Sequence, residues 1–211
     1  KSQRGIDMTL SEFDNEIRKD YNVVCGCDEA GRGPLAGDVF AAAVIFDKDT
    51  VIEGINDSKK LTAKKREELF DEIMEKAVDF SIQTATVEEI EDINILNAAM
   101  LAMKRAVEDM DTKPDVCLID GNKTPEGLEC PAIAVVKGDA KSQAVAAASI
   151  LAKVARDRYM EQMAEQYPEY RFEKHKGYGT KLHYQMIDQY GPCGIHRMSF
   201  LKKYYAKKNG H

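Results

Sequence analysis

Residues 23–39 read VVCGCDEAGRGPLAGDV and form the most informative pattern in the chain. The apolar run 23–28 predicts a buried strand, and the adjacent acids Asp28 and Glu29 stand where that run ends. The Gly-Arg-Gly segment 31–33 favours a turn, because glycine adopts backbone conformations that other residues avoid. An isolated pair of acids is commonly a solvated corner. The whole composite instead predicts carboxylates at a strand end, beside a backbone that a ligand can approach closely.

Composition indicates one globular protein. The chain has 211 residues and 44% hydrophobic content, enough for a sizeable core. No apolar stretch approaches the ~18 residues of a membrane span, and the first residues lack the core of a signal peptide. We therefore expect a cytoplasmic protein without a membrane partner. The five cysteines are odd in number and mostly lie in apolar surroundings, which favours reduced thiols. The pair Cys25 and Cys27 lacks the second pair that a zinc site would need.

Charge is unevenly distributed. The net charge is −6, yet residues 171–211 hold nine Lys and Arg against two acids, so the rest of the chain is strongly acidic. This basic segment also contains all four histidines and seven aromatic residues. Such a mixture is expected where a protein contacts a phosphate backbone, sugars or bases. A solvated helical cap explains the charges equally well, and both interpretations stay open on these grounds.

Strand and helix patterns alternate along the chain, which predicts an α/β protein. The apolar run 39–46 predicts a second strand that a hairpin joins to the first. The further strands are predicted at 79–87, 116–119 and 131–137, and the helices at 62–77, 87–92, 95–110 and 142–166. Pro168 ends the last of these helices and marks the start of a C-terminal extension.

Three acids share one position relative to the predicted strands. Asp28, Asp120 and Asp139 each stand at the C-terminal end of an apolar run, the edge at which sheet proteins usually place their sites. Carboxylates without histidine or cysteine select Mg²⁺ or Mn²⁺ over zinc, and their mutual repulsion makes sense mainly with cations bound. Neighbouring strand residues point to opposite faces, so Asp28 and Glu29 are expected to share the site only if the chain bends at Glu29.

The motifs together resemble the ribonuclease HII family over nearly the whole chain after residue 22. They are CDEAGRGPLAG (27–37), DSKKL (57–61), IDGN (119–122), VKGD (136–139), AAASILAKVARD (146–157), HKGYGT (175–180) and HRMSF (196–200). The resemblance implies a ribonuclease H-like mixed five-stranded sheet flanked by helices, with a C-terminal helical extension. The related type III enzymes lack this Gly-Arg-Gly near the first acids, so type II is favoured. One departure is Asp38, where the family commonly has proline, and it leaves that local turn open.

The resemblance also implies an activity and a catalytic site. The activity is endonucleolytic cleavage of RNA in RNA–DNA hybrids, including incision 5′ of a single ribonucleotide in duplex DNA, to leave 5′-phosphate and 3′-hydroxyl ends. The implied catalytic and metal-binding residues are Asp28, Glu29, Asp120 and Asp139, with Mg²⁺ or Mn²⁺ as the cofactor. We expect a monomer, and the sequence does not indicate whether a replication clamp binds.

Substrate recognition needs groups beyond the acids, because a metal cluster treats RNA and DNA phosphates alike. The backbone of Gly31, Arg32 and Gly33 can offer donors and acceptors to a 2′-hydroxyl. The family resemblance adds Tyr178, which would address the RNA–DNA junction. Among several basic residues considered as phosphate contacts, including Arg197, only Lys59 is retained, because lysines are mostly solvated surface residues.

The expected organisation is a lead at 1–22 and a single domain at 23–211, divided into a catalytic core (23–167) and a basic extension (168–211). Two other functions are less consistent with the sequence. A dinucleotide-binding oxidoreductase needs Gly-x-Gly-x-x-Gly before a helix, whereas Pro, Leu and Ala follow Gly33 and the next element is a strand. A non-catalytic hybrid-binding module would use the basic segment, but three acids on one rim would repel phosphate.

Overall fold

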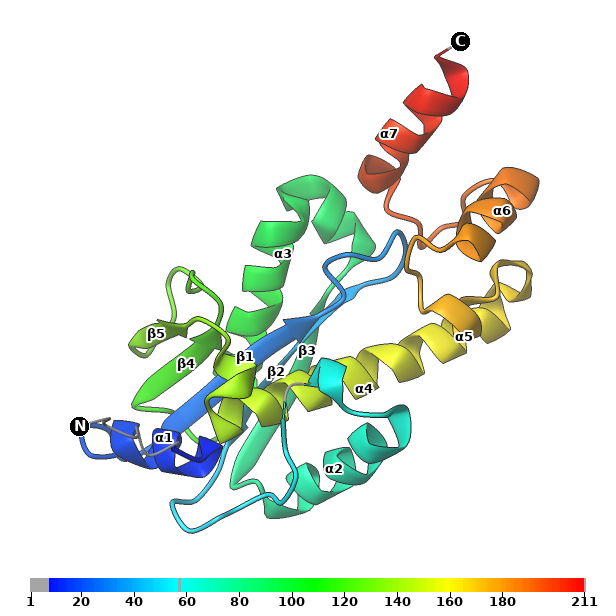
Figure 1. The fold of residues 1–211 in the computed structure, drawn as a ribbon. Helices are drawn as coiled ribbons and strands as arrows, with labels where there is room; N and C mark the ends of the chain where they lie inside the picture. The colour runs from blue at the N-terminus through cyan, green and yellow to red at the C-terminus, as the bar shows by residue number, and fades with distance from the viewer. Residues whose placement is uncertain (1–7, 57, 211) are drawn as a thin grey trace, which may run out of the picture.

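Five strands form one mixed sheet at the centre of the molecule (Figure 1), a computed structural model that describes residues 8–56 and 58–210. The strands are β1 (Val24–Ala30), β2 (Val39–Ile45), β3 (Asp79–Ala85), β4 (Val116–Asp120) and β5 (Ala132–Val135), in the order β3-β2-β1-β4-β5. β1 is antiparallel to β2 and parallel to β4, and β4 is parallel to β5. The predicted mixed five-stranded sheet and the β1–β2 hairpin are therefore confirmed.

β1 is longer than predicted. Glu29 and Ala30 continue the ladder and pair with Ala41 and Phe40 of β2. The condition that the chain bends at Glu29 is therefore not met, because the ladder to β2 stays regular up to the glycine turn.

Seven helices are found in the described part of the chain. They are α1 (Leu10–Ile17), α2 (Ala63–Lys76), α3 (Val87–Asp109), α4 (Gln143–Gln166), α5 (Phe172–His175), α6 (Lys181–Tyr190) and α7 (Met198–Asn209), with short 3₁₀ turns η1 (Ser58–Lys60), η2 (Gly138–Ala140) and η3 (Pro168–Tyr170). The hydroxyls of Thr62, Thr86 and Ser142 accept hydrogen bonds from the first turns of α2, α3 and α4. Within α3, Asn94 has a φ of 70°, a break that separates the two helices predicted there.

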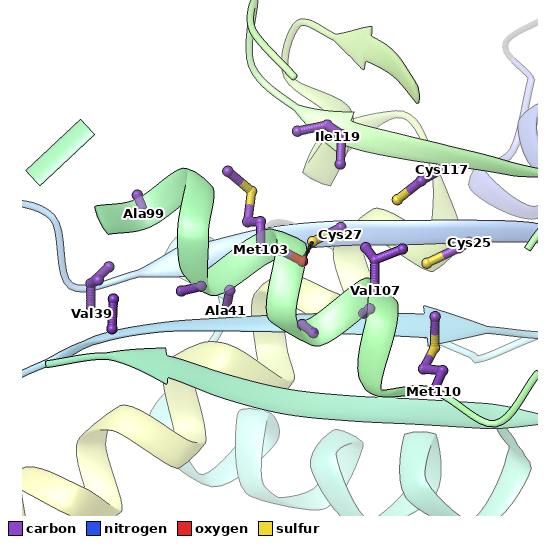
Figure 2. Close-up of a cluster of buried hydrophobic side chains, with 14 of the residues drawn as sticks. Cys25, Cys27, Val39, Ala41, Ala99, Met103, Val107, Met110, Cys117 and Ile119 are labelled. Carbon is purple, nitrogen blue, oxygen red and sulfur yellow. Dashed lines mark hydrogen bonds between the residues drawn. The ribbon is translucent and has the colours of Figure 1, made fainter. Parts of the chain in front are cut away.

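Helices cover both faces of the sheet (Figure 1). α3 packs over β1 and β2 through a core that includes Cys25, Cys27 and Met103, shown in Figure 2. α2 and α4 cover the opposite face. There, Gly26 of β1 lies against the backbone of Ala144, where a Cβ atom would be 2.2 Å from the Ala144 carbonyl carbon. This close approach sets the N-terminus of α4 against β1, two residues from Asp28.

All five cysteines are free thiols. Cys25, Cys27 and Cys117 are buried among the apolar side chains of the α3 layer. Burial raises the pKa of Cys25 well above its ordinary value, which keeps this thiol protonated and in the role of a small core residue.

Part of the N-terminal lead is ordered as α1, an element that our sequence interpretation did not include. Phe13 and Ile17 pack against a core cluster on the sheet. Asp14 is buried and accepts a 2.9 Å hydrogen bond from the backbone N–H of Ala144 at the start of α4. Residues 1–7 of the lead lie outside the described residues. In the part of the chain that is described, no helix combines the length and apolar character needed to cross a membrane.

Candidate active site

The three strand-end aspartates gather at one edge of the sheet. β1, β4 and β5 run parallel, Asp28 lies near the end of β1, Asp120 ends β4, and Asp139 lies in η2 shortly after β5. The Oδ1 atom of Asp120 accepts hydrogen bonds from the backbone N–H groups of Gly138 at 2.7 Å and Asp139 at 3.3 Å. Asp120 therefore ties the segment that carries Asp139 to the end of β4.

Asp28 and Glu29 reach this edge without a bend. The even-numbered residues of β1 face α4, as Gly26 does, and the odd-numbered residues face α3. Both carboxylates nevertheless line one cleft of about 420 Å³ together with Asp120, because that cleft opens at the end of the strand. Glu29 also lines an adjoining hollow against α3.

Repulsion among the four carboxylates shapes their electrostatics. The pKa of Asp28 is raised well above its ordinary value, first by burial and then by the negative charges of Glu29, Asp120 and Asp139. Among the residues described, no three His, Cys, Asp or Glu side chains are already grouped closely enough to hold one metal ion. The donor set still fits hard divalent cations, which take oxygen ligands and relieve this repulsion.

All five residues predicted to contact substrate lie in the same cleft as three of the acids. Its lining consists of Asp28, Glu29, Ala30, Gly31, Arg32, Gly33, Ser58, Lys59, Asp120, Ser149, Lys153 and Tyr178. Asp139 is not part of the lining: it is 8% exposed, and its backbone N–H donates to Asp120. Asp57 of the DSKKL motif lies outside the described residues. Arg32 forms a 3.3 Å ion pair with Glu29, which links the turn to the acids.

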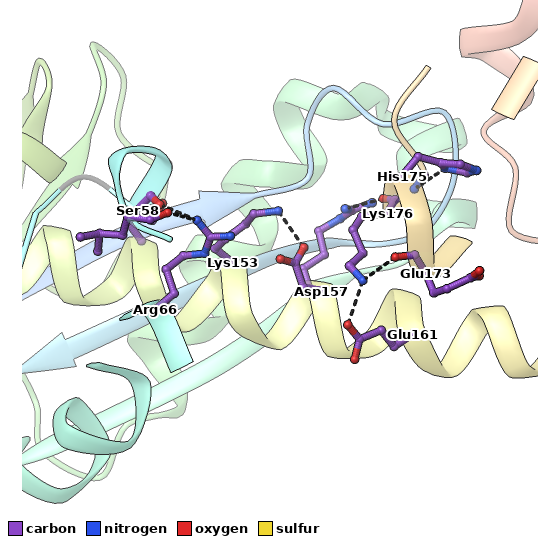
Figure 3. A network of polar contacts seen from close by, with 12 residues as sticks. Ser58, Arg66, Lys153, Asp157, Glu161, Glu173, His175 and Lys176 are labelled. Carbon is purple, nitrogen blue, oxygen red and sulfur yellow. Dashed lines mark hydrogen bonds and ion pairs between the residues drawn. The ribbon is translucent and has the colours of Figure 1, made fainter. Parts of the chain in front are cut away.

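Tyr178 presents its ring at the glycine turn. The side chain is 41% exposed, and a Cβ atom on Gly33 would lie 3.7 Å from its ring. The Lys153 ammonium lies 5.8 Å from the ring centroid and donates a 2.7 Å hydrogen bond to Asp157, as Figure 3 shows. Sequence reasoning missed Lys153, whose only signal is its place on α4 within the 146–157 motif.

Buried histidines fix the backbone of Tyr178. The N–H of Cys193 donates to Nδ1 of His196, at 2.8 Å. This bond assigns the proton of His196 to Nε2, which donates to Nε2 of His183 at 2.9 Å. Nδ1 of His183 then donates to the carbonyl of Tyr178, also at 2.9 Å. The chain of bonds requires both rings to be neutral.

Because both rings are buried and neutral, we expect the stability of the protein to fall at acidic pH. Burial lowers the pKa of both His183 and His196 to about 4, from an ordinary value of 6.5. The unfolded chain therefore binds protons first, and the free energy of unfolding should fall by on the order of a few kcal/mol as the pH drops from about 6.5 to about 4. Urea denaturation across this range measures the slope. A double variant with both histidines replaced by Asn should show a shallower slope, whereas an unchanged slope would contradict the assignment.

The structure also defines the roles of Arg197 and Asp38. Arg197 is fully buried and so cannot contact phosphate. Asp38, where the family commonly has proline, accepts a 2.9 Å hydrogen bond from the N–H of Val87. It thereby satisfies a donor at the first turn of α3, and β2 begins at the next residue.

Comparison with known proteins agrees with this geometry. A family model described as Ribonuclease HII matches residues 25–203. The chain is 54% identical over 199 residues to a ribonuclease HII of Caldicellulosiruptor saccharolyticus, covering 94% of this chain and 97% of that one. It is 58% identical over 178 residues to a ribonuclease HII of Idiomarina loihiensis, covering 84% and 95%. The crystal structure of ribonuclease H2 from Pyrococcus horikoshii is similar with a TM-score of 0.70 and 30% identity, over 84% of this chain and 93% of that one.

Proposed function

This chain belongs to the ribonuclease HII family, and we propose that it cleaves beside single ribonucleotides in duplex DNA as well as within RNA–DNA hybrids. As a type HII ribonuclease H it is an endonuclease acting on RNA–DNA substrates. The proposed products carry 5′-phosphate and 3′-hydroxyl ends. The observation that supports the proposal is one cleft that joins the carboxylates to a backbone turn and to Tyr178. Cleavage chemistry and ribose recognition can therefore act on the same nucleotide.

The four acids are assigned different roles. Enzymes of this family depend on divalent metal ions, and Asp28, Glu29, Asp120 and Asp139 would hold Mg²⁺ or Mn²⁺ here. When bound, such ions activate water and stabilise charge on the leaving oxygen. Asp28 and Asp120 are the proposed ligands nearest the scissile phosphate. Glu29 and Asp139 complete the set or orient water.

Ribose recognition is assigned to groups outside the acids. The backbone of Gly31, Arg32 and Gly33 lines the cleft, with Arg32 and Gly33 exposed, and would address the 2′-hydroxyl. The ring of Tyr178 would stack on the sugar at the junction, and Lys59 would contact a phosphate. The extension at 168–211 would act with the core as one domain, because its segments bond directly to the turn. Gly37 donates to the carbonyl of Ile195 at 2.9 Å.

Cleavage should depend on both the ribonucleotide and the cation. We expect cutting 5′ of the ribonucleotide in a DNA duplex that carries one, and within a long hybrid, when Mg²⁺ or Mn²⁺ is added. An all-DNA duplex of the same sequence is the matched control and should stay intact. Chelator should stop cleavage while leaving binding measurable. Binding without cleavage under every metal condition would instead indicate a non-catalytic hybrid-binding module.

A further inference from the structure

Two buried arginines lie directly beneath the glycine turn. Arg197, at the start of α7, is 0% exposed, and Arg156 of α4 is 1% exposed. Neither forms an ion pair with a carboxylate of the described residues within 4.0 Å, although buried charges are usually paired. Their partners are backbone carbonyls instead.

Arg197 uses all of its donors on the turn. Its Nη2 donates to the carbonyls of Gly31 and Gly37, both at 2.6 Å. Its Nη1 donates to those of Arg32 at 3.1 Å and Pro34 at 2.9 Å, and Nε donates to Gly37 at 2.9 Å. A guanidinium has five N–H groups in a fixed plane, so this one side chain fixes four carbonyls of residues 31–37.

Arg156 holds the turn from α4. It donates to the carbonyls of Ala36 at 2.9 Å, Asp38 at 3.1 Å and Lys176 at 3.0 Å. It also fills the space beside Gly31, where a Cβ atom would lie 2.1 Å from its Nε. The φ of +97° at this glycine is strained for other residues. A side chain at residue 31 would therefore displace the guanidinium.

The direction of these carbonyls determines the direction of the amides. No peptide bond among the described residues is cis, and in a planar trans peptide the C=O and the following N–H point in opposite directions. The carbonyls of Gly31 and Arg32 point inward to Arg197, so the N–H groups of Arg32 and Gly33 point away from it, on the side of the cleft. Neither N–H has a hydrogen-bond partner among the described residues.

We propose that Arg197 is a positioning residue for ribose selectivity: it draws the carbonyls of residues 31–37 inward and thereby presents the Arg32 and Gly33 amides to a 2′-hydroxyl. The inference rests on the proposed function of the turn. Burial lowers the pKa of Arg197 to about 9, with the charge of Arg156 as the next cause, so the guanidinium stays protonated at neutral pH. Its charge lies behind the amides and increases their attraction for an electronegative oxygen.

The test uses substitutions that separate the positive charge of Arg197 from the planar arrangement of its five N–H donors. Arg197→Lys keeps the charge but has three donors on one nitrogen. We expect it to lower kcat/KM on a duplex with one ribonucleotide by about 10²-fold, as for a misplaced contact near the reacting atoms. Inhibition by an all-DNA duplex and Mn²⁺ affinity by calorimetry should change less than about twofold, because neither involves the oriented amides. Arg105→Lys is the matched control, since Arg105 of α3 pairs with Glu89 and does not line the cleft.

A second variant tests the shape of the missing group. Activity of Arg197→Ala should recover in low millimolar guanidinium and not in equal urea or sodium chloride, since only guanidinium restores a charged planar fork. Folding of the variant is followed by circular dichroism.

A further measurement uses the wild-type protein and needs no variant. In chelator, the amide NMR signals of Arg32 and Gly33 should shift with the ribonucleotide duplex and not with the all-DNA duplex.

The outcomes separate the inference from the proposed function. If wild type fails to cut at the ribonucleotide, the proposed function is wrong. If wild type cuts there and folded Arg197→Lys retains the same preference over all-DNA duplex, Arg197 is only a packing residue and the inference is wrong. Equal amide shifts with both duplexes would also overturn it, even if every Arg197 variant failed to fold.

Discussion

Asp120→Asn should lower the rate of cleavage by about 10³-fold or more while leaving the fold and hybrid binding largely intact. Metal ions supply several kcal/mol of transition-state stabilisation, and each 1.36 kcal/mol is tenfold in rate. Asn keeps the volume of Asp and the Oδ1 acceptor that binds the N–H of Gly138. The charge is lost, and with it one of the proposed ligands.

The measurements are single-turnover cleavage in Mg²⁺, Mn²⁺ affinity by calorimetry, and thermal unfolding. Asp47→Asn is a matched control, because Asp47 is exposed and follows the end of β2. β2 is antiparallel to β1, so this acid lies at the edge of the sheet opposite the site. Wild-type cleavage by Asp120→Asn, with normal Mn²⁺ affinity, would mean that Asp120 is not a metal ligand.

The candidate site was predictable where its position depends on strand direction. Asp120 and Asp139 follow short apolar runs, and the ends of parallel strands meet at one edge, so the sequence pattern and the observed edge agree. The error at Glu29 had a physical cause. We required neighbouring side chains to turn to one face, whereas a cleft at the end of a strand is open to side chains from both faces.

The sequence signals that mark the ends of helices also allowed correct predictions. Thr86 and Ser142 cap helices at or next to the predicted starts. α1 was missed although it has such a signal, a capping box formed by Thr9 and Glu12. Its eight residues offer a short apolar pattern, and its position is fixed by contact between Asp14 and Ala144, far away in the chain.

The support of the turn was not predictable from the sequence. An arginine in a basic segment is typically on the surface, and nothing local to Arg197 indicates that four carbonyls near residue 34 will surround it. The same holds for His183 and His196, whose partners come from separate segments of the extension. Polar groups that are buried by contacts between distant segments leave no periodic pattern in the sequence. Their burial is therefore seen only in the three-dimensional structure.

Tyr178 should act on recognition rather than on metal binding. We expect Tyr178→Ala to lower kcat/KM at a single embedded ribonucleotide by about 10²-fold, with a smaller effect on a long RNA–DNA hybrid. The ring lies beside Gly33 at the mouth of the cleft, where it would hold the sugar of the junction. Its loss leaves the four acids in place, so Mn²⁺ affinity should be unchanged. Binding energy from groups near the reacting atoms commonly appears as turnover.

Two further substitutions refine this prediction. Tyr178→Phe keeps the ring and removes the hydroxyl, so an intermediate loss would divide the effect between stacking and hydrogen bonding. Tyr190→Ala is the control, because Tyr190 is a half-exposed tyrosine of α6 that does not line the cleft. All proteins are compared on the one-ribonucleotide duplex and the long hybrid, alongside calorimetric Mn²⁺ titration. Equal losses on both substrates would mean that Tyr178 does not recognise the junction. A large loss of Mn²⁺ affinity would instead place Tyr178 among the metal-binding residues.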